Sequence, residues 1–339
     1  RQARGVGLFA AEAPPSDCRQ LYEKRLAEIN GELRRLEQSR SFLEERLELE
    51  AKADFSRPVG IPLAALNWLV CPDCRESLVL ESDQIRSGQI ISGALTCPHC
   101  GRVLPVEDGI LMVSPAPDAH KNFSSFDRFI DQTNQPLMQA ISQSVRLMKS
   151  RVAKYQRPVR TFLDAGSGFG FFLRYTYDLI PDHSLYFAVD HDPMRHRFLK
   201  SVLASMPEQK NIALLCCDYG DIPLRSGSID QIIDFGGSND YSWIVPGFLM
   251  ERLDWLTHEK STALYLNRSY DRISFDSSIQ PECRGYLYEE AILSNLKKLG
   301  YAIRERYRMD FTTPLQATNP FMNDRDQMYR LWLYLEKQR

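Results

Sequence analysis

The sequence has little that would point to a membrane, a polyanionic partner or a disulfide scaffold. Its longest apolar stretch, residues 61–70, is too short and too interrupted to span a bilayer, and no signal peptide is recognisable. Lys and Arg number 42 against 44 Asp and Glu, so there is no overall basic excess for nucleic-acid binding. Eight cysteines are few for 339 residues, and four of them form two C-x-x-C pairs, which favours a reducing, cytoplasmic location.

The length predicts two or three domains, and the composition predicts a soluble globular protein. We expect a linker at 1–15, a long helix at 16–57, a compact block at 58–117 and an α/β domain at 118–339. The chain begins with Arg1 rather than Met, so we expect the natural N-terminus to lie before it.

Residues 16–57 carry the pattern of a coiled coil. Apolar residues recur at alternating spacings of three and four, interrupted only by Arg40 and flanked by mixed Glu and Arg. This seam consists of Tyr22, Leu26, Ile29, Leu33, Leu36, Leu43 and Leu47. A stripe this narrow predicts a homodimer through residues 16–57, and the alternative is one amphipathic helix packed on its own domain.

The stretch "CRQLYEKRLAEINGELRRLEQSRSFLEERL" within this helix resembles the dimerisation helix of MerR-type bacterial transcription regulators. In that family the helix follows a winged helix-turn-helix and pairs two subunits antiparallel. The resemblance therefore implies a DNA-binding domain that is absent from this chain and would precede Arg1.

The block at 58–117 contains a predicted metal site. Cys71 and Cys74 are followed, after a gap of 22 residues, by Cys97 and Cys100. Each pair allows a tight turn to aim two sulfurs at one ion, and four thiolates suit Zn²⁺ rather than a hard cation. A closed four-cysteine set makes this zinc structural; the alternative is ordinary buried cysteines or a redox pair. His99 could replace a ligand, but we expect it beside the site or on the surface.

This block resembles the zinc ribbon of small methyltransferase-activator proteins, a ribbon that is also fused before some bacterial methyltransferases. The likeness lies in the four cysteines, in Gly101 after the last of them, and in Pro105 with the Asp108-Gly109-Ile110 tail. Leu104 stands where an aromatic residue is often seen, a departure that touches no predicted metal ligand.

Beyond residue 118, apolar β-like runs alternate with helical stretches, which predicts a doubly wound, mostly parallel sheet. The predicted strands are 160–164, 185–189, 212–216, 231–235, 261–267 and 302–309.

The first of these strands leads into the turn "LDAGSGFG", whose glycines decide the ligand class. Gly166, Gly168 and Gly170 are spaced by two, and Phe171 stands where a dinucleotide turn needs its third glycine. Asp164 before the turn would repel a pyrophosphate. The same carboxylate would attract the ammonium group of S-adenosylmethionine (SAM). The turn therefore predicts SAM rather than NAD as the ligand.

The acidic residues that end the later strands agree with this prediction. Asp190 can accept hydrogen bonds from both ribose hydroxyls, and His191 would pack near the ribose. Asp218 can accept from the adenine amino group, with Tyr219 beside the ring. The fourth strand ends at Asp234, which completes the predicted set of cofactor residues.

This constellation is similar to that of the class I SAM-dependent methyltransferases, on the motifs "LDAGSGFG", "VDHDPM" and "CCDYGDIPLRSGSIDQII". The resemblance covers roughly residues 120–310. It implies a Rossmann-like sheet of seven strands, the last antiparallel, with the cofactor across the strand C-termini, and it implies methyl transfer.

The acceptor is less well defined. Residues 234–237 read Asp-Phe-Gly-Gly, without the Pro-Pro-aromatic turn of amino-methylating DNA enzymes or the cysteine of cytosine C5 enzymes, so DNA methylation is disfavoured. An aromatic wall with polar groups would suit a small or planar acceptor, the alternative being an ordinary surface loop. These predicted substrate contacts are Asn239, Asp240, Tyr241 and Trp243. No residue stands out as a general base.

Two functions remain open. The first is an active methyltransferase that acts on a small molecule or RNA, for which an rRNA base methyltransferase with an N-terminal zinc module is the nearest analogy. The second is a transcription regulator that senses SAM or another ligand without catalysis. Our working hypothesis combines a SAM-dependent methyltransferase with a MerR-like dimeric regulator.

Overall fold

The computed structural model describes residues 15–51, 57–115, 135–154, 158–310, 323 and 325–338. The chain separates into two compact units, Arg1–Asp54 and Phe55–Arg339. Within the described ranges, no helix is both long and apolar enough to cross a membrane.

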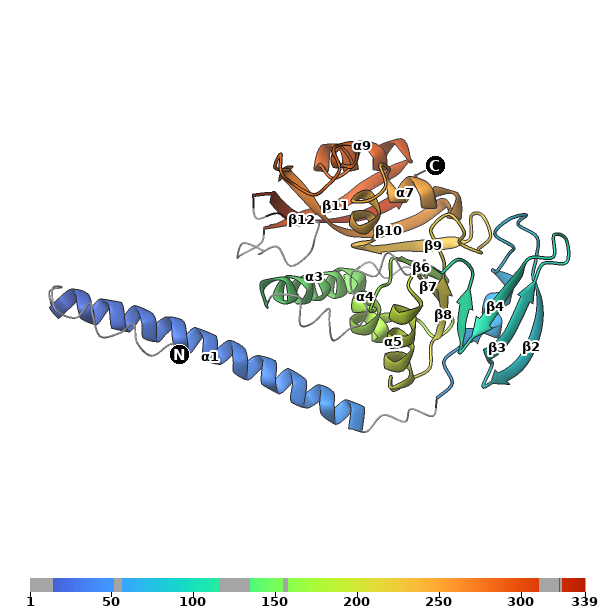
Figure 1. The fold of residues 1–339 in the computed structure, drawn as a ribbon, viewed down its shortest axis with the longest axis horizontal. Helices are drawn as coiled ribbons and strands as arrows, with labels where there is room; N and C mark the ends of the chain where they lie inside the picture. Colours follow the sequence, from blue (N-terminus) through green and yellow to red (C-terminus); the bar gives the residue numbers. More distant parts are fainter. Residues whose placement is uncertain are drawn as a thin grey trace. The chain divides into compact units, whose positions relative to one another are not determined.

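The described residues of the first unit form a long helix, α1 (Pro15–Ala51), of 37 residues (Figure 1). Proline suits the first helical position because its missing N–H would have no partner there. The seam side chains from Tyr22 to Leu36 are exposed by 41–58%, whereas those of Leu43 and Leu47 lie outside the described side chains. The predicted helix is present, and its pairing with a second copy stays a prediction.

The second unit begins with the ribbon segment. Its elements are β1 (Ile61–Pro62), the 3-10 turn η1 (Leu63–Asn67), β2 (Val79–Arg86), β3 (Gln89–Thr96), β4 (Val103–Glu107) and β5 (Ile110–Met112). β3 pairs antiparallel with β1, β2 and β4. Asp108 and Gly109 both have positive φ in the two-residue turn between β4 and β5, the conformation that an Asp-Gly hairpin favours.

The rest of the unit alternates strands and helices. The strands are β6 (Thr161–Ala165), β7 (Leu185–Asp190), β8 (Asn211–Cys216), β9 (Ile229–Phe235), β10 (Thr257–Arg272), β11 (Tyr301–Asp310) and β12 (Gln327–Lys337). The helices are α3 (Gln135–Lys154), α4 (Phe171–Thr176), α5 (Pro193–Ala204), α6 (Gly237–Ser242), α7 (Leu249–Leu253), α8 (Pro281–Arg284) and α9 (Glu289–Lys298), with 3-10 turns η3 (Tyr177–Leu179) and η4 (Asp254–Leu256).

All of these strands form one mixed sheet of 12 strands rather than a seven-stranded sheet with a separate ribbon. The order is β1-β3-β4-β5-β8-β7-β6-β9-β10-β12-β11, and β2 also pairs with β3. In the sheet order from β5 through β8, β7, β6 and β9 to β10, each strand is parallel to the next. β12 runs antiparallel to both β10 and β11. β5 supplies hydrogen-bond partners that an edge strand β8 would otherwise lack, which is the physical reason for the larger sheet.

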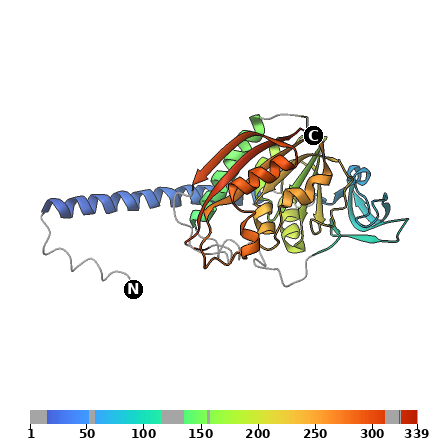
Figure 2. The same cartoon turned by 90° about the horizontal axis from the view of Figure 1, so that it is seen from above.

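Helices cover both faces of this sheet (Figures 1 and 2). On one face, residues of α3, α4 and α5 pack against β6 to β8 and β12. On the other, α7 and α9 pack in a cluster that also contains Leu104 and Leu111 of the ribbon. The ribbon and the α/β region therefore share a hydrophobic core, so neither is expected to keep its full stability without the other.

Of the described strands after residue 118, β12 was not among those predicted from the sequence. β12 contains the uninterrupted apolar run from Leu331 to Leu335, and all five of these side chains are buried. Such a run has no alternation of apolar and polar residues, because both faces of the strand are covered.

Candidate cofactor site and metal centre

The glycine turn follows β6 at the C-terminal edge of the parallel strands. Gly166, Gly168 and Gly170 all adopt left-handed backbone conformations, with φ of 76°, 54° and 72°. A Cβ atom on Gly166 would lie 2.7 Å from the Tyr219 hydroxyl oxygen, and one on Gly170 would lie 2.4 Å from a methyl carbon of Leu199. The backbone angle therefore favours glycine at all three positions, and at Gly166 and Gly170 a Cβ atom would also displace a neighbouring side chain.

Asp190 ends β7 and holds this turn through its side chain. One carboxylate oxygen accepts the N–H of Gly168 at 2.9 Å, and the other accepts the N–H of Asp192 at 2.9 Å. Burial raises the pKa of Asp190, but the positive charge of Arg195, the two neighbouring histidines and the Asp192 N–H together outweigh burial and keep the pKa below its usual range. An ionised carboxylate thus lies beside the turn, as the predicted ribose site requires. His191, the next residue, is half-buried.

Two residues at this point were not predicted, and both lie in α5. Arg195 Nη1 is 3.4 Å from Asp190, and its Nε is 3.6 Å from Asp192. The Nε2 atom of buried His196 lies 3.1 Å from the Asp190 carbonyl oxygen and 3.0 Å from that of Leu215. Burial lowers the pKa of His196, so the neutral ring braces β7 against β8. Arg195 could have been found from the sequence, because it lies in the first turn of a helix that directly follows an Asp at the end of a strand.

Asp164 occupies β6 itself and is buried. Its carboxylate accepts a hydrogen bond from the Tyr186 hydroxyl at 2.7 Å. Burial raises the pKa of Asp164 to about 7, and the charges of Asp190 and Asp234 act in the same direction. A cationic ligand group beside this carboxylate would favour its ionised form.

The loop after β8 carries the predicted adenine contacts. Asp218 is exposed, and its backbone N–H donates to the Ser114 hydroxyl at 3.0 Å. The Tyr219 hydroxyl lies against Gly166, and its ring meets that of Tyr241 edge-on at 6.0 Å. Burial and the charge of Asp190 raise the pKa of Tyr219 well above its usual value, so the phenol stays protonated. Tyr219 thus covers the glycine turn from the β8 side.

Two further residues of the ribbon bind the same loop, in addition to Ser114. The N–H of Val70, next to the first metal ligand, donates to the Pro223 carbonyl at 2.9 Å. Arg75, directly after the second ligand, donates to the Ile222 carbonyl at 3.1 Å and lies over the Trp255 ring at 4.3 Å. The loop that would contact adenine is therefore fastened by the two residues that flank the first cysteine pair of the ribbon.

The polar residues at the end of β9 and in the helix that follows it are largely hydrogen-bonded within the protein. The Asp234 carboxylate accepts the Ser238 N–H at 2.9 Å and its hydroxyl at 2.5 Å, and burial raises the pKa of Asp234 to about 6. The Asn239 amide donates to the Arg268 carbonyl at 2.8 Å and accepts the Arg268 N–H at 2.5 Å. Both side chains therefore fasten α6 to the sheet.

Of the other three predicted acceptor contacts, one is buried and two remain accessible. Trp243 is buried in a cluster with Tyr270 and Ile273, and the Arg268 guanidinium lies 4.5 Å above its ring. Asp240 is exposed and Tyr241 is half-buried. Of the four residues, Asp240 and Tyr241 are the two whose side chains remain accessible to a ligand.

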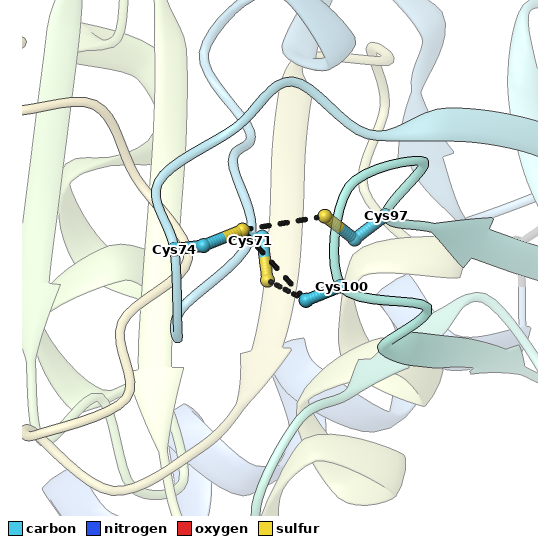
Figure 3. A group of neighbouring side chains, drawn as sticks. All are labelled: Cys71, Cys74, Cys97 and Cys100. Atoms are coloured by element: carbon cyan, nitrogen blue, oxygen red, sulfur yellow. Dashed lines mark hydrogen bonds between the residues drawn. The ribbon is translucent and has the colours of Figure 1, made fainter.

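The four ribbon cysteines form one cluster (Figure 3), with all sulfur atoms within 4.8 Å of one another. The sulfurs of Cys71 and Cys100 are 3.5 Å apart, and those of Cys74 and Cys97 are 3.4 Å apart. A tetrahedral ion with Zn–S bonds of about 2.3 Å requires sulfur separations of about 3.8 Å. Backbone N–H groups of Cys100 and His99 lower the pKa of Cys97 to about 6, whereas burial and the neighbouring sulfurs raise the pKa values of Cys74 and Cys100, so the four thiols share their protons unequally.

The geometry of the two turns explains this convergence. Arg75 and Gly101, each directly after the second cysteine of a pair, have φ of 65° and 76°. Their N–H groups donate back to the carbonyls of Cys71 and Cys97 at 2.9 Å. The donor set fits zinc, and the exposed His99 lies outside the cluster.

Comparisons with known proteins bear on the ribbon most directly. Residues 63–109 match the family described as Trm112p-like protein. No curated protein matches the chain.

Among solved structures, the chain is similar to M. jannaschii TYW2 in complex with AdoMet, at 12% identity over 77% of this chain and 94% of that chain, with a TM-score of 0.38. It is similar to a SAM-dependent methyltransferase from Aquifex aeolicus, at 16% identity over 55% and 97%, with a TM-score of 0.38. It is also similar to the cyclopropane synthase MmaA2 from Mycobacterium tuberculosis, at 11% identity over 57% of this chain and 83% of that chain, with a TM-score of 0.42. At these values of identity and TM-score, the structural likenesses assign no activity to this chain. The chain's own residues fit a zinc ion in a Trm112-like ribbon and SAM at the edge of the α/β sheet.

Proposed function

We propose that this chain is a SAM-dependent methyltransferase with a structural zinc ribbon. The observation that carries the proposal is the bond between the Gly168 N–H and the Asp190 carboxylate, at 2.9 Å. It joins a turn of three left-handed glycines to an ionised acid on the neighbouring strand. Together these groups offer a close backbone approach and a ribose acceptor at the C-terminal edge of a parallel sheet, where such folds bind ligands.

The residues of the chain have separate roles in this proposal. Asp164 and Asp190 bind the amino and ribose groups, and Asp218 and Tyr219 contact the adenine. SAM itself supplies an electrophilic methyl group on its sulfonium. The protein therefore needs chiefly to orient the acceptor and exclude water, and no general base is assigned.

For the acceptor we propose a small molecule or RNA that approaches beside α6. Asp240 and Tyr241 support this because they are the accessible polar and aromatic groups of that helix. Asp234 is hydrogen-bonded to Ser238, and Asn239 is hydrogen-bonded to Arg268. These two residues would therefore hold α6 in place rather than contact the acceptor.

Transfer of an isotopically labelled methyl group tests the enzymatic proposal. The zinc-loaded chain is incubated with labelled SAM and with separate RNA, DNA, protein and small-molecule fractions of a bacterial lysate. Label in the RNA or the small-molecule fraction supports the proposal and names the acceptor class. SAM binding without label in any fraction would instead favour the ligand-sensing regulator.

We further propose that α1 pairs with α1 of a second copy to form a homodimer. The exposed seam from Tyr22 to Leu36 supports this pairing, because a helix with one apolar stripe is stabilised by burying it. A MerR-like regulatory role would follow if a DNA-binding domain precedes this helix in the natural protein.

Replacing Leu26 and Ile29 by Asp tests the dimer. Sedimentation velocity should give a dimer for the original chain and a monomer for the double variant. Lys24→Glu, off the seam, is the matched control and should remain dimeric. A double variant that stays dimeric would contradict pairing through α1.

A further inference from the structure

Arg195 is incompletely satisfied for a residue so deeply placed. Its side chain is 17% exposed, between Asp190 and Asp192, whose side chains are 2% and 7% exposed. Within the described part of the chain, its hydrogen bond to Asp190 is long, at 3.4 Å, and its buried Nε makes no hydrogen bond, because the nearest carboxylate oxygen, on Asp192, is 3.6 Å away. A guanidinium has five N–H donors, and a buried donor without an acceptor is costly. The shortage points to a ligand that brings acceptor atoms.

Asp190 has the complementary shortage. Its two oxygens offer about four lone-pair directions, and the N–H groups of Gly168 and Asp192 and the Arg195 guanidinium already take three. A ribose diol brings two hydroxyl donors, but it also brings oxygen atoms that accept hydrogen bonds. Asp190 alone can satisfy neither all of the diol's donors nor any of its acceptors.

We infer that Arg195 is the second half of the ribose site, donating to a ribose hydroxyl oxygen while that hydroxyl donates to Asp190. This inference rests on the proposed function, since it assumes an adenosine-containing ligand. A carboxylate beside a guanidinium presents one acceptor and one donor surface to a hydroxyl group, and charged partners make both hydrogen bonds strong. Phe169, whose ring centre lies 5.8 Å from the guanidinium carbon, limits the space in which Arg195 can move.

A purely structural role for Arg195 makes a different forecast. Burial lowers the pKa of Arg195, but Asp190, Asp240 and Asp192 together raise it, so the guanidinium compensates several carboxylates. If that were its whole role, its removal would weaken every adenosine ligand equally. The ribose role instead predicts a loss that depends on the ligand's hydroxyl groups.

The test measures calorimetric affinity for S-adenosylhomocysteine and for its 2′-deoxy and 3′-deoxy forms. The proteins are the zinc-loaded original chain, Arg195→Met, Arg195→Lys and the control Arg197→Met, which changes an exposed arginine of the same helix. We expect Arg195→Met to bind S-adenosylhomocysteine about tenfold more weakly. We expect that variant to lose most of the original chain's discrimination against at least one deoxy form. Arg195→Lys should keep part of it, and Arg197→Met should keep all of it.

Equal discrimination by Arg195→Met and the original chain, with both folded and zinc-loaded, would overturn the inference. A melting profile and the zinc content of each variant establish that it is folded, and Arg195→Lys provides the measurement if Arg195→Met is not. If the original chain bound no adenosine ligand, the proposed function itself would fail, which is a distinct result from binding without dependence on Arg195.

Discussion

The two walls of the proposed cofactor site are built in different ways. On the β6 and β7 side, the glycine turn and Asp190 lie 22 residues apart and bond directly to each other. On the β8 side, the loop that begins at Asp218 is held by Ser114, 104 residues earlier in the chain, and by Val70 and Arg75 of the zinc ribbon. The first wall is defined by local sequence, whereas the second depends on a distant, metal-stabilised segment.

The ribbon therefore helps to hold the β8 side of the proposed cofactor site in place. β5 extends the sheet beside β8, and the ribbon shares a hydrophobic cluster with the α/β region. We therefore expect damage to the ribbon to affect the β8 wall first, while substitutions at the β6 and β7 wall should leave the ribbon intact.

The largest effect is expected from loss of the metal. Cys97→Ser removes one of four zinc ligands, and folding of a small ribbon depends on the metal it binds. We expect zinc content to fall well below one per chain and SAM affinity to fall with it, as measured by metal analysis and calorimetry. His99→Ala, between two ligands but exposed, is the control and should keep its zinc. Full zinc content in Cys97→Ser would refute the four-cysteine site.

A second effect concerns pH and the β6 wall. Because burial raises the pKa of Asp164 to about 7, its carboxyl is largely neutral at pH 6 and largely ionised at pH 8. An ionised carboxylate attracts the SAM ammonium, so affinity should rise several-fold from pH 6 to about pH 7.5, below the pH of about 8 near which the ligand's own α-ammonium loses its proton. Asp164→Asn can still accept the Tyr186 hydrogen bond, and it should bind SAM more weakly with no such rise. A variant with the same calorimetric pH profile as the original chain would argue against this role.

A smaller effect tests the β8 wall alone. Ser114→Ala removes the acceptor of the Asp218 N–H, and loss of one neutral hydrogen bond should weaken SAM binding roughly two- to tenfold. Zinc content should not change. Ser82→Ala is the matched control, because Ser82 donates to the Ser92 carbonyl within the ribbon hairpin. Identical SAM affinity in the two variants would remove Ser114 from the support of the site.

The four-cysteine cluster could be predicted from the sequence, because spacing alone brings its ligands together. Two C-x-x-C pairs bring four sulfurs together because each turn constrains its own pair. The glycine turn likewise meets Asp190 because adjacent parallel strands end at the same edge. Both features depend on short-range geometry and on one strand neighbour.

Other features depend on contacts that spacing does not specify. The fusion of the ribbon to β8 is set by edge-strand pairing, and Arg195 is positioned by the orientation of α5. Asn239 looks like a substrate residue in the sequence, yet its amide bonds the β10 backbone at Arg268. Whether a polar side chain faces a ligand or fastens a helix is decided by tertiary packing.

Calorimetric titration of SAM into the zinc-loaded chain, into Gly166→Ala and into Gly88→Ala tests the central claim most directly. Both glycines have nearly the same positive φ, 76° and 74°, but a Cβ on Gly166 would meet Tyr219 and Gly237, whereas one on Gly88 meets nothing within 4 Å. We predict one SAM site per chain in the original protein and in Gly88→Ala, and binding at least about tenfold weaker in Gly166→Ala, because Tyr219 or the turn must move. No binding by the original chain, or equal binding by all three proteins, would contradict a SAM site on the glycine turn.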